Sequence, residues 1–571
     1  MTNTWTQIQE RKWDVIIVGG GITGAGILRE AVRRNLSALL VEQKDFAWGT
    51  SSRSSKLVHG GLRYLATGQL GLTLMSVRER EQLLEDGPGL IDPLGFLIAT
   101  HKGDNPGRLS YTAGLAVYDL MALQWSHRYY SADDFKMLAP HINAENLQGG
   151  FRYGDAQTDD SRLVLRVIQE AEGGVAVNYT RAEGVLRDGE QVCGVILRNL
   201  ETDETAEIKA RVVMNATGAW ADHLREQIGA EAKMRPLRGS HLIFPAWKLP
   251  VAQAITFLHP VDRRPVFIFP WEGVTLVGTT DIDHEGSLND EPRISPDEVA
   301  YLMAAVAHQF PSRHVTLGDV IATYAGVRPV VGSGKDDPSK ESRDYVIWQE
   351  NGLLTVTGGK LTTFRAIALN ALEAAADFLP QLPDLPDDTP VLDAVEDTLP
   401  PNVSESKRRR LIGRFGHYAA DLVQAAQDGE LQTIPGTTTL WAELRWAARK
   451  ESVVHLEDLM LRRTRLGLLL PGGGEKILPR IREICQSELG WNDAKWDAEV
   501  IAYLTLWGES YSLPPRDLIP DWDVMLADVK QQKETAIEPK SMPKPLIPVL
   551  FIFGLIMWRF FFRRGERPAG E

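Results

Sequence analysis

The sequence predicts an α/β protein with a β-rich second domain, an all-α C-terminal domain and an apolar C-terminal helix. Three observations predict this organisation: a βαβ unit with a glycine-rich turn at the start of the chain, strand-like runs through its middle, and helical periodicity after a proline-rich segment. The chain has 571 residues, which is enough for about three or four domains. Its composition, 43% hydrophobic and 24% charged, excludes a disordered or fibrous protein.

The βαβ unit lies at the very start of the chain. Residues 14–18 form a nearly all-apolar run, as in a parallel strand that is buried on both faces. A G-x-G-x-x-G turn follows and leads into a predicted helix at 25–35 and a second predicted strand at 38–41. In such a turn the glycines allow a sharp bend, close approach of a pyrophosphate and close packing of helix on strand. We expect the dinucleotide to contact Gly19, Gly21, Ile22, Thr23 and Gly24.

Glu42 ends the second predicted strand, at the chain distance where a carboxylate binds the ribose diol of a dinucleotide. Gln43 follows it and is expected at the same site. An acid at this position favours an unphosphorylated ribose, and hence FAD or NAD rather than NADP. The sequence therefore predicts a dinucleotide site; the alternative is a tight βα turn that binds no ligand.

Two further segments favour a bound cofactor or anion. Residues 49–64 combine small hydroxyl residues with basic residues and glycines, a composition that suits wrapping an anionic ligand; the alternative is a solvated loop. Residues 208–215 predict a strand that leads to Thr217-Gly218, where bare backbone can approach a cofactor; the alternative is an ordinary turn at a strand end.

Residue patterns also divide the chain into domains. Residues 161–172 predict an amphipathic helix with Ser161 as its N-cap. Strand-like runs dominate residues 240–320, and residues 352–365 repeat a strand–glycine–helix pattern. We expect a discontinuous cofactor-binding domain at 12–75, 151–239 and 321–380, a substrate domain at 76–150 and 240–320, a proline-rich linker at 381–403, a helical domain at 404–513 and a connector at 514–544.

The last part of the chain predicts association with a membrane. Residues 545–558 carry no charge, and a basic pair, Arg563 and Arg564, follows the apolar run. The run is marginal in length for a spanning helix, so a short anchor, a helix in the membrane interface and a buried core helix are all left open. Since residues 1–13 lack a secretory signal, we expect the protein at the cytoplasmic face of the membrane, peripheral or anchored by residues 545–564.

Charge and cysteine content exclude several classes of protein. Lys and Arg total 62 against 76 Asp and Glu, and the resulting net charge of −14 argues against nucleic-acid binding. Two cysteines, Cys193 and Cys485, are too few for a disulfide framework or a cysteine-rich metal site. We therefore expect no nucleic-acid partner and no metal.

Short segments spread along the chain carry a family resemblance. GGGITGAG, TSSRSSKLVHGGLRYL, NATGAW, GSH, GTTD, GVRP, SRDY and GGKLTTFR occur in the order found in FAD-dependent glycerol-3-phosphate dehydrogenases. Over residues 12–510 the chain resembles this family, a branch of the D-amino-acid-oxidase-like flavoproteins. The resemblance implies a Rossmann-like FAD-binding domain of the glutathione-reductase/D-amino-acid-oxidase type. Arg238 departs from the family pattern, which has Lys before Gly-Ser-His.

The resemblance also implies an activity and a set of site residues. The activity is oxidation of sn-glycerol 3-phosphate to dihydroxyacetone phosphate, with a hydride passing to flavin N5 and electrons to a membrane quinone. Further FAD contacts implied are Thr50, Ser51, Ser52, Ser55, Lys56, Leu57, Ala216, Thr217, Gly218, Gly359, Lys360, Leu361 and Thr362. The implied substrate contacts are Arg63, Tyr64, His241, Thr280, Arg328, Arg343 and Lys360.

Three of these residues are assigned catalytic roles. His241 is the candidate proton acceptor, because neutral imidazole can take a proton near pH 7. Arg328 and Arg63 would hold the phosphate, since the guanidinium fork matches phosphate geometry. The alternatives are a structural histidine and arginines in structural ion pairs.

Other functions remain open at the level of sequence. An oxidase would return the electrons to oxygen, and an amine or amino-acid oxidase of the same fold would bind a carboxylate in place of the phosphate. A non-catalytic, flavin-retaining scaffold at the membrane is a further alternative. The oligomeric state is also open, with a homodimer among the options.

Overall fold

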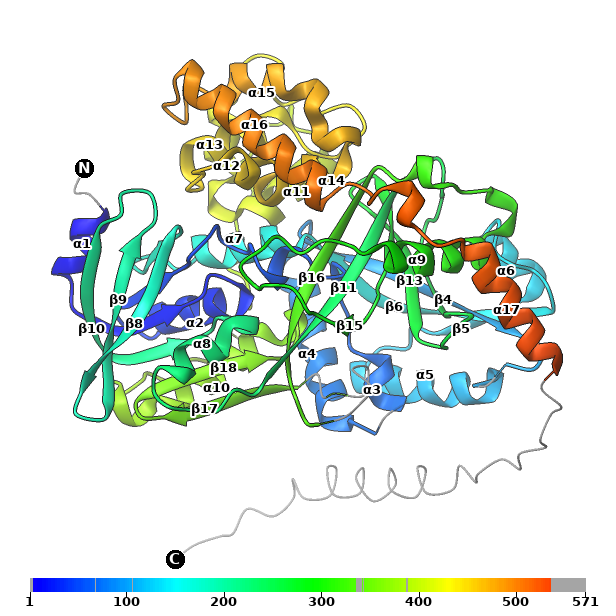
Figure 1. Ribbon diagram of the computed structural model, residues 1–571, viewed down its shortest axis with the longest axis horizontal. Coiled ribbons are helices and arrows are strands. Elements are labelled where there is room, and N and C mark those ends of the chain that lie inside the picture. Colours follow the sequence, from blue (N-terminus) through cyan, green and yellow to red (C-terminus); the bar gives the residue numbers. More distant parts are fainter. Residues whose placement is uncertain are drawn as a thin grey trace, which may run out of the picture. The chain divides into compact units, whose positions relative to one another are not determined.

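The computed structural model describes residues 4–66, 68–104, 106–334, 341, 344–386 and 389–535. Residues 1–523 form one compact unit, and residues 524–571 form a second. The first unit contains two β-sheets and a group of C-terminal helices (Figure 1). Helix α17 (Trp522–Thr535) begins at the end of the first unit.

The first sheet has a parallel core with an antiparallel extension. Its main path runs β17-β18-β10-β1-β2-β7, and only β17 on this path pairs antiparallel with its neighbour. A hairpin, β8–β9, extends from the first half of β10. The strands are β1 (Trp13–Val18), β2 (Ala38–Val41), β7 (Val175–Val177), β8 (Thr180–Asp188), β9 (Gln191–Asn199), β10 (Thr205–Asn215), β17 (Tyr345–Glu350) and β18 (Leu353–Gly358).

Both faces of this sheet are covered, which explains its continuous apolar strands. Val15 and Ile17 of β1 pack in a cluster with helices α2 (Ile22–Arg33) and α10 (Phe364–Ala374). Ile16 and Val18 face the other side, in a cluster with the β8–β9 hairpin, α1 (Thr4–Glu10) and α8 (Ala221–Glu226). The alternation of side chains along β1 therefore serves two apolar layers.

Helix α7 (Asp160–Gln169) lies beside α2, and its N-terminus corrects the sequence prediction. The N-cap is Asp159, whose side chain accepts a hydrogen bond from the Arg162 backbone N–H at 3.3 Å. The predicted cap, Ser161, donates instead to the backbone oxygen of Arg462 at 2.8 Å. A carboxylate two residues upstream offered the same capping chemistry, and only the tertiary contact distinguishes the two positions.

The second sheet has ten strands and helices on both faces. Its main path runs β15-β11-β14-β13-β12-β4-β6-β3, with β16 paired to β11 and β5 to β6. The strands are β3 (Leu57–Val58), β4 (Ile91–His101), β5 (Arg128–Ser131), β6 (Leu147–Thr158), β11 (Met234–Pro245), β12 (Ala254–Leu258), β13 (Pro265–Trp271), β14 (Val274–Gly278), β15 (Ile282–Asp283) and β16 (Ala322–Val331).

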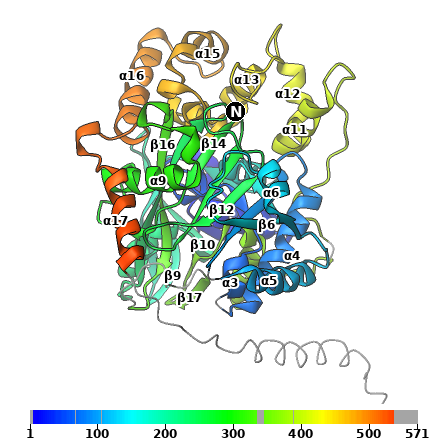
Figure 2. The same ribbon diagram turned by 90° about the vertical axis from the view of Figure 1, so that its right-hand side faces the viewer.

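One side of this sheet packs against α4 (Leu70–Asp86) and α5 (Arg108–Ala122), with α3 (Leu62–Ala66) beside them. Figure 2 shows these three helices grouped together. The other side packs against α6 (Ala132–Leu138) and α9 (Pro296–Gln309).

The helical part follows a segment without helix or strand in residues 381–386 and 389–403. That segment is packed rather than free, because Val391 and Leu392 are buried in a cluster with Leu83 of α4. The helices that follow in the first unit are α11 (Glu405–Phe415), α12 (Ala419–Ala425), α13 (Trp441–Lys450), α14 (Leu466–Leu469), α15 (Leu478–Cys485) and α16 (Asp493–Ser510), with a π-helical turn at Asp458–Arg463.

Buried ion pairs attach this helical part to the first sheet's domain. Arg463 donates to both carboxylate oxygens of Asp45, at 2.6 and 2.7 Å, and Arg462 donates to the same carboxylate. Arg162 of α7 makes a bidentate pair with Glu451 at 2.6 and 2.8 Å. Burial alone would raise the pKa of Asp45, but the charges of Arg463 and Arg462 hold it below its ordinary value.

The predicted apolar helix at 545–564 lies outside the described residues. Among the residues that the structure does describe, no helix combines the length and apolar character needed to cross a bilayer.

Asp45→Asn should destabilise the protein by about 3 to 5 kcal/mol, because two buried guanidinium groups would lose their shared counter-charge. Urea unfolding followed by tryptophan fluorescence measures the change. Asp133→Asn is the matched control, since Asp133 pairs with Lys136 at an exposed position and should change stability little. Equal unfolding midpoints for the two variants would contradict the role given to Asp45.

Candidate active site

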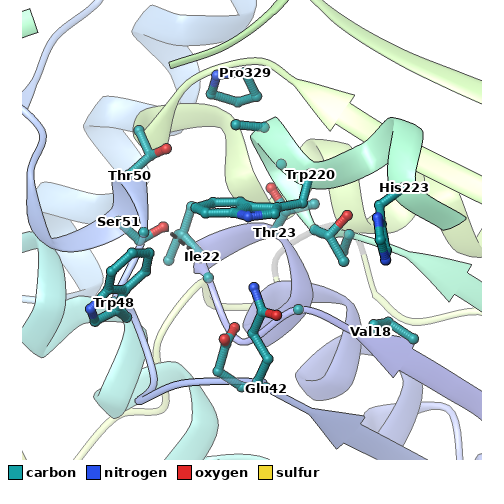
Figure 3. A pocket seen from close by; sticks show the side chains of 18 of the residues that line it. Val18, Ile22, Thr23, Glu42, Trp48, Thr50, Ser51, Trp220, His223 and Pro329 are labelled. Carbon is teal, nitrogen blue, oxygen red and sulfur yellow. Dashed lines mark hydrogen bonds between the residues drawn. The ribbon is translucent and has the colours of Figure 1, made fainter. Parts of the chain in front are cut away.

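A cleft opens where the parallel strands of the first sheet end. The cofactor cleft, as we call it, is lined by residues from segments 18–23, 41–43, 48–54, 180–182, 216–224 and 358–361, together with Pro329 (Figure 3). These segments include the residues that follow the carboxyl ends of β1, β2, β10 and β18. Ligands of open α/β sheets bind at this edge of the strands.

The glycine-rich turn holds the strands and helix α2 in close contact. Gly19 has φ +117°, and a Cβ there would lie 2.5 Å from the carbonyl oxygen of Ala216. A Cβ on Gly24 would lie 1.9 Å from the carbonyl oxygen of Gly19. Gly24 therefore packs the helix against the turn and does not itself line the cleft, whereas Gly19 and Gly21 do. The turn leaves exposed backbone beside the N-terminus of α2, which suits a phosphate.

Glu42 lines one end of the cofactor cleft. Its carboxylate accepts hydrogen bonds from the backbone N–H groups of Gly20 at 2.7 Å and Lys44 at 2.9 Å. Burial raises the pKa of Glu42, and the two N–H donors oppose that rise. In the view of Figure 3, Glu42 and Pro329 lie at opposite edges of the labelled residues, with the Trp220 ring between them.

Most residues predicted to bind the cofactor line the cleft: Gly19, Gly21, Ile22, Thr23, Glu42, Gln43, Thr50, Ser51, Ala216, Thr217, Gly218, Gly359, Lys360 and Leu361. The predicted residues outside the lining are Gly24, Ser52, Ser55, Lys56, Leu57 and Thr362. Lys56 is buried, and its Nζ donates to the Ser52 backbone oxygen at 2.6 Å and to Asp160 at 2.9 Å. Its contacts therefore support the loop that carries Thr50 and Ser51.

The cleft also contains residues that the sequence analysis did not assign. Trp48 and Trp220 line it, with ring centroids 5.9 Å apart, and Arg181, His223 and Pro329 line it as well. The sequence contains a weak indication for Trp220, because this residue closely follows the Thr217-Gly218 pair at the end of a predicted strand. Pro329 belongs to the GVRP segment, whereas Trp48, Arg181 and His223 lie in no phosphate-binding or catalytic pattern, so only the fold brings these three residues to the cleft.

Lys360 lines the cofactor cleft and lies against the ring of Tyr64. The Lys360 Nζ lies 4.0 Å from the centroid of the Tyr64 ring. Lys360 also donates to Ser76 Oγ of α4 at 2.5 Å. Burial lowers the pKa of Lys360 to about 7, while Asp155 and Asp344 act to raise it.

Arg328 is on β16, directly before the cleft residue Pro329. It donates to Asp281 at 3.0 Å and to Thr279 Oγ1 at 2.9 Å. A Cβ on Gly239 would lie 2.1 Å from Arg328 Nη2, so the glycine of the Arg-Gly-Ser-His segment makes room for the guanidinium. Arg63 is an exposed residue of α3, and Arg343 lies outside the described residues.

His241 is buried on β11, opposite Tyr324 of β16, and their rings stack with centroids 4.5 Å apart. Its Nε2 lies 2.9 Å from Ser55 Oγ, and within the described part of the chain its buried Nδ1 has no hydrogen-bond partner. Burial lowers the pKa of His241 well below its ordinary value, and the charges of Lys56 and Arg328 act in the same direction. The imidazole is therefore neutral at pH 7 and can accept a proton, although it is not part of the cleft lining.

Thr280 contributes to a structural contact next to these groups. Its hydroxyl donates to Glu298 at 2.6 Å and accepts the Ser240 backbone N–H at 2.8 Å. The same Glu298 carboxylate pairs with Arg238 at 2.9 Å. Arg328 contacts the side-chain hydroxyl of Thr279, whereas it contacts Thr280 only through the Thr280 backbone oxygen, to which it donates at 3.3 Å.

Comparisons with known proteins agree with this geometry. Residues 14–365 match the family described as FAD dependent oxidoreductase, and residues 367–496 match the C-terminal domain of alpha-glycerophosphate oxidase. The aerobic glycerol-3-phosphate dehydrogenase of Staphylococcus aureus (strain USA300) is 35% identical over 487 residues, covering 80% of this chain and 87% of that protein. The chain belongs to the FAD-dependent glycerol-3-phosphate dehydrogenase family.

Solved structures support this assignment. The glycerol-3-phosphate dehydrogenase from Bacillus halodurans, complexed with FAD, superposes with a TM-score of 0.70 at 27% identity, covering 88% of this chain and 96% of that one. The L-alpha-glycerophosphate oxidase from Mycoplasma pneumoniae, with a TM-score of 0.51 at 19% identity and coverage of 66% and 100%, shares the fold. The predicted family, the α/β class with a helical C-terminal domain, and FAD as the cofactor are confirmed.

The cleft of this family member fits FAD on its own geometry. Glycine backbone lines the turn where a pyrophosphate would lie, and Glu42 stands at one end to accept ribose hydroxyl groups. Lys360 lines the cleft as well, with backbone from Gly358 and Gly359 at the carboxyl end of β18. These residues can hold an extended dinucleotide without a large side chain displacing the phosphates.

Gly24→Ala should lower FAD affinity by at least about tenfold, because the added methyl group would overlap the Gly19 carbonyl and shift the turn. The flavin-to-protein ratio after purification, and FAD titration of the apoprotein by fluorescence, measure the effect. Gly114→Ala in α5 is the control, since a Cβ there has no neighbour within 4 Å. Full flavin content in Gly24→Ala would show that the turn tolerates a side chain.

Proposed function

We propose that this protein oxidises sn-glycerol 3-phosphate to dihydroxyacetone phosphate with bound FAD. The observation that carries the proposal is the match over most of the chain to aerobic glycerol-3-phosphate dehydrogenases. In this chain, two of the predicted substrate residues lie at the cofactor cleft: Lys360 lines it, and Arg328 directly precedes the lining residue Pro329. The substrate carries nearly two negative charges at neutral pH, so the cationic side chains of Lys360 and Arg328 suit it.

The phosphate would be bound by cationic side chains from three separate elements. Arg328 comes from β16, Lys360 follows β18 and Arg63 comes from α3. Arg328 is oriented by Asp281 and Thr279, which leaves its planar fork in a defined direction. Fixed cations of this kind bind the phosphate and hold carbon 2 of the substrate in one place.

His241 is the proposed acceptor of the substrate's hydroxyl proton. When Nε2 carries its hydrogen and donates to Ser55, the lone pair lies on Nδ1, the buried atom without a partner among the described residues. When bound, FAD supplies the acceptor for the hydride that leaves carbon 2. The neutral imidazole and the proton it takes complete the removal of two electrons and two protons from the secondary alcohol.

An anaerobic titration tests this function directly. Glycerol 3-phosphate should bleach the visible flavin band of the wild-type holoenzyme, and sarcosine, glycine and D-amino acids should not. If only an amino acid bleached the flavin, the protein would be an amine or amino-acid oxidase instead. A yellow protein that no candidate substrate bleaches would favour a non-catalytic scaffold.

Arg328→Ala should reduce kcat/KM for glycerol 3-phosphate by roughly 30-fold to several thousand-fold, because the phosphate would lose a partly buried charge partner. The measurement is steady-state turnover with a soluble dye acceptor. Arg211→Ala is the control, since Arg211 is exposed and pairs with Asp14 at the surface. Unchanged kcat/KM in Arg328→Ala would refute the phosphate-binding role.

We further propose that the electrons pass to a quinone and that the enzyme works at the cytoplasmic face of the membrane. Large apolar side chains at the ends of α5 support this: Leu109 is 84% exposed, Leu123 88% and Trp125 74%. Helix α5 packs beside α3, which carries Arg63 and Tyr64 (Figures 1 and 2). The uncharged run at residues 545–558, with the basic residues that follow it, is a second support. A homodimer stays a prediction.

Deletion of the chain after Lys540 should release the enzyme from membranes and leave its activity with a soluble dye unchanged, because the apolar run lies outside the family match. Fractionation of cells and binding to lipid vesicles measure the effect. The double variant Leu123→Glu with Trp125→Glu separates the contribution of α5. Identical fractionation of full-length and truncated protein would rule out an anchor in the tail.

A further inference from the structure

Ser76 of α4 contacts the lysine of the cofactor cleft. Its side chain is fully buried, and its Oγ accepts a hydrogen bond from Lys360 Nζ at 2.5 Å. Ser76 does not line the cleft, and neither the residue patterns nor the substrate set predicted from the sequence includes it. The contact joins residues 284 positions apart in the chain.

The Ser76 hydroxyl is fixed as an acceptor. Its own hydrogen is donated to the Leu72 backbone oxygen, four residues earlier in the same helix, at 2.6 Å. Because a hydroxyl has one hydrogen and two lone pairs, only lone pairs are left to face Lys360. The serine therefore determines where the Lys360 amine lies and which way its N–H groups point.

The remaining contacts of Lys360 leave its charge available to a ligand. The amine lies over the Tyr64 ring, and a Cβ on Gly61 would come within 3.2 Å of Nζ, so Gly61 gives the amine space. Within the described part of the chain, no carboxylate lies at ion-pair distance from Lys360. A hydroxyl and an aromatic face thus hold a cation that no acid neutralises by direct contact.

We propose that Ser76 is a positioning residue that fixes the Lys360 amine at the substrate end of the cofactor cleft. The hydrogen bond itself is independent of the reaction. The effect on catalysis rests on the proposed function, because it assumes that the ligand there is an anionic substrate.

The electrostatic surroundings give the expected direction of a pH effect. The charged or titratable groups that act on Lys360 or lie against it are Tyr64 of α3, Asp155 of β6, Asp344, and His59, whose own pKa is lowered by burial and by Lys360; Arg80 of α4 pairs with Asp155. The acids raise the pKa of Lys360 and burial lowers it to about 7. An accepted hydrogen bond favours the ammonium form, so loss of the Ser76 hydroxyl lowers that pKa further.

A lower pKa of Lys360 changes the pH dependence of activity. If the ammonium form binds the substrate, kcat/KM falls as pH rises through the pKa of Lys360. In a variant with a lower pKa of Lys360, kcat/KM begins to fall at a lower pH. At pH 8 Ser76→Ala should reduce kcat/KM by roughly tenfold, mainly through a higher KM, since hydrogen bonds to charged groups have effects of this size.

The experiment uses the holoenzyme and three variants. Ser76→Ala removes the acceptor, and Ser76→Cys keeps an atom at the γ position while replacing oxygen by sulfur, a weak acceptor. Thr73→Ala is the matched control: Thr73 is also buried in α4 and donates to a backbone oxygen four residues earlier, at 3.0 Å, without touching Lys360. The lysines are labelled biosynthetically with ¹³C and ¹⁵N at the side-chain end, which leaves the amine unmodified, and Lys360→Arg identifies the Lys360 signal.

Two measurements decide the proposal. NMR titration of the labelled lysine should show a lower pKa in both Ser76 variants and the wild-type value in Thr73→Ala, and the pH profile of kcat/KM should shift in the same order. An unshifted titration in a folded Ser76→Cys protein would overturn the proposal. If the wild-type protein does not oxidise glycerol 3-phosphate, the proposed function fails, whereas the NMR titration still tests the contact between Ser76 and Lys360.

Discussion

Close backbone contact at the first βα turn is the constraint on which the site depends. Gly19 lies against the Ala216 carbonyl, and Gly24 lies against Gly19, so two parallel strands and a helix converge with no side chain between them. This convergence places the N-terminus of α2 and the strand ends of β1 and β10 at one edge of the sheet. A cofactor can then contact segments that are about 200 residues apart in the sequence, because the sheet brings their ends together.

Buried ion pairs also hold the loop that lines the cleft in place. Asp160, at the start of α7, accepts hydrogen bonds from Ser54, Lys56 and Arg465, the last of which belongs to the helical C-terminal part. The loop that lines the cleft at Thr50 and Ser51 is therefore tied to a distant part of the chain. Such charges are costly to bury unless paired, and Arg465 of the helical part adds a second cation beside Lys56 to balance the buried carboxylates Asp159 and Asp160.

Local patterns predicted the elements of the site better than its contacts. The βαβ unit and Glu42 followed from glycine spacing and strand periodicity, since both act over about 30 residues. Lys56 shows the limit: no local pattern indicated that its side chain is buried against Asp160, and its contact with the cofactor stays a prediction. The N-cap of α7 shows the same limit, because Asp159 and Ser161 have similar capping chemistry and only the contact between Ser161 and Arg462 separates them. Trp48 and Arg181 were missed because they reach the cleft through tertiary structure alone.

Arg328 and Lys360, the two principal cations of the site, differ in how firmly they keep their charge, and this difference suits different tasks. Arg328 stays charged at any physiological pH and is held by an acid, Asp281, and a hydroxyl, so it can serve as a permanent phosphate ligand. Lys360 has an amine whose charge responds to burial, and its pKa of about 7 lies close to neutral pH. A guanidinium at position 360 would keep its charge at any physiological pH, but it is larger than the amine, which already lies against Tyr64, Ser76 and the Gly61 backbone. These contacts therefore suit lysine, and with it a charge that the surrounding residues can adjust.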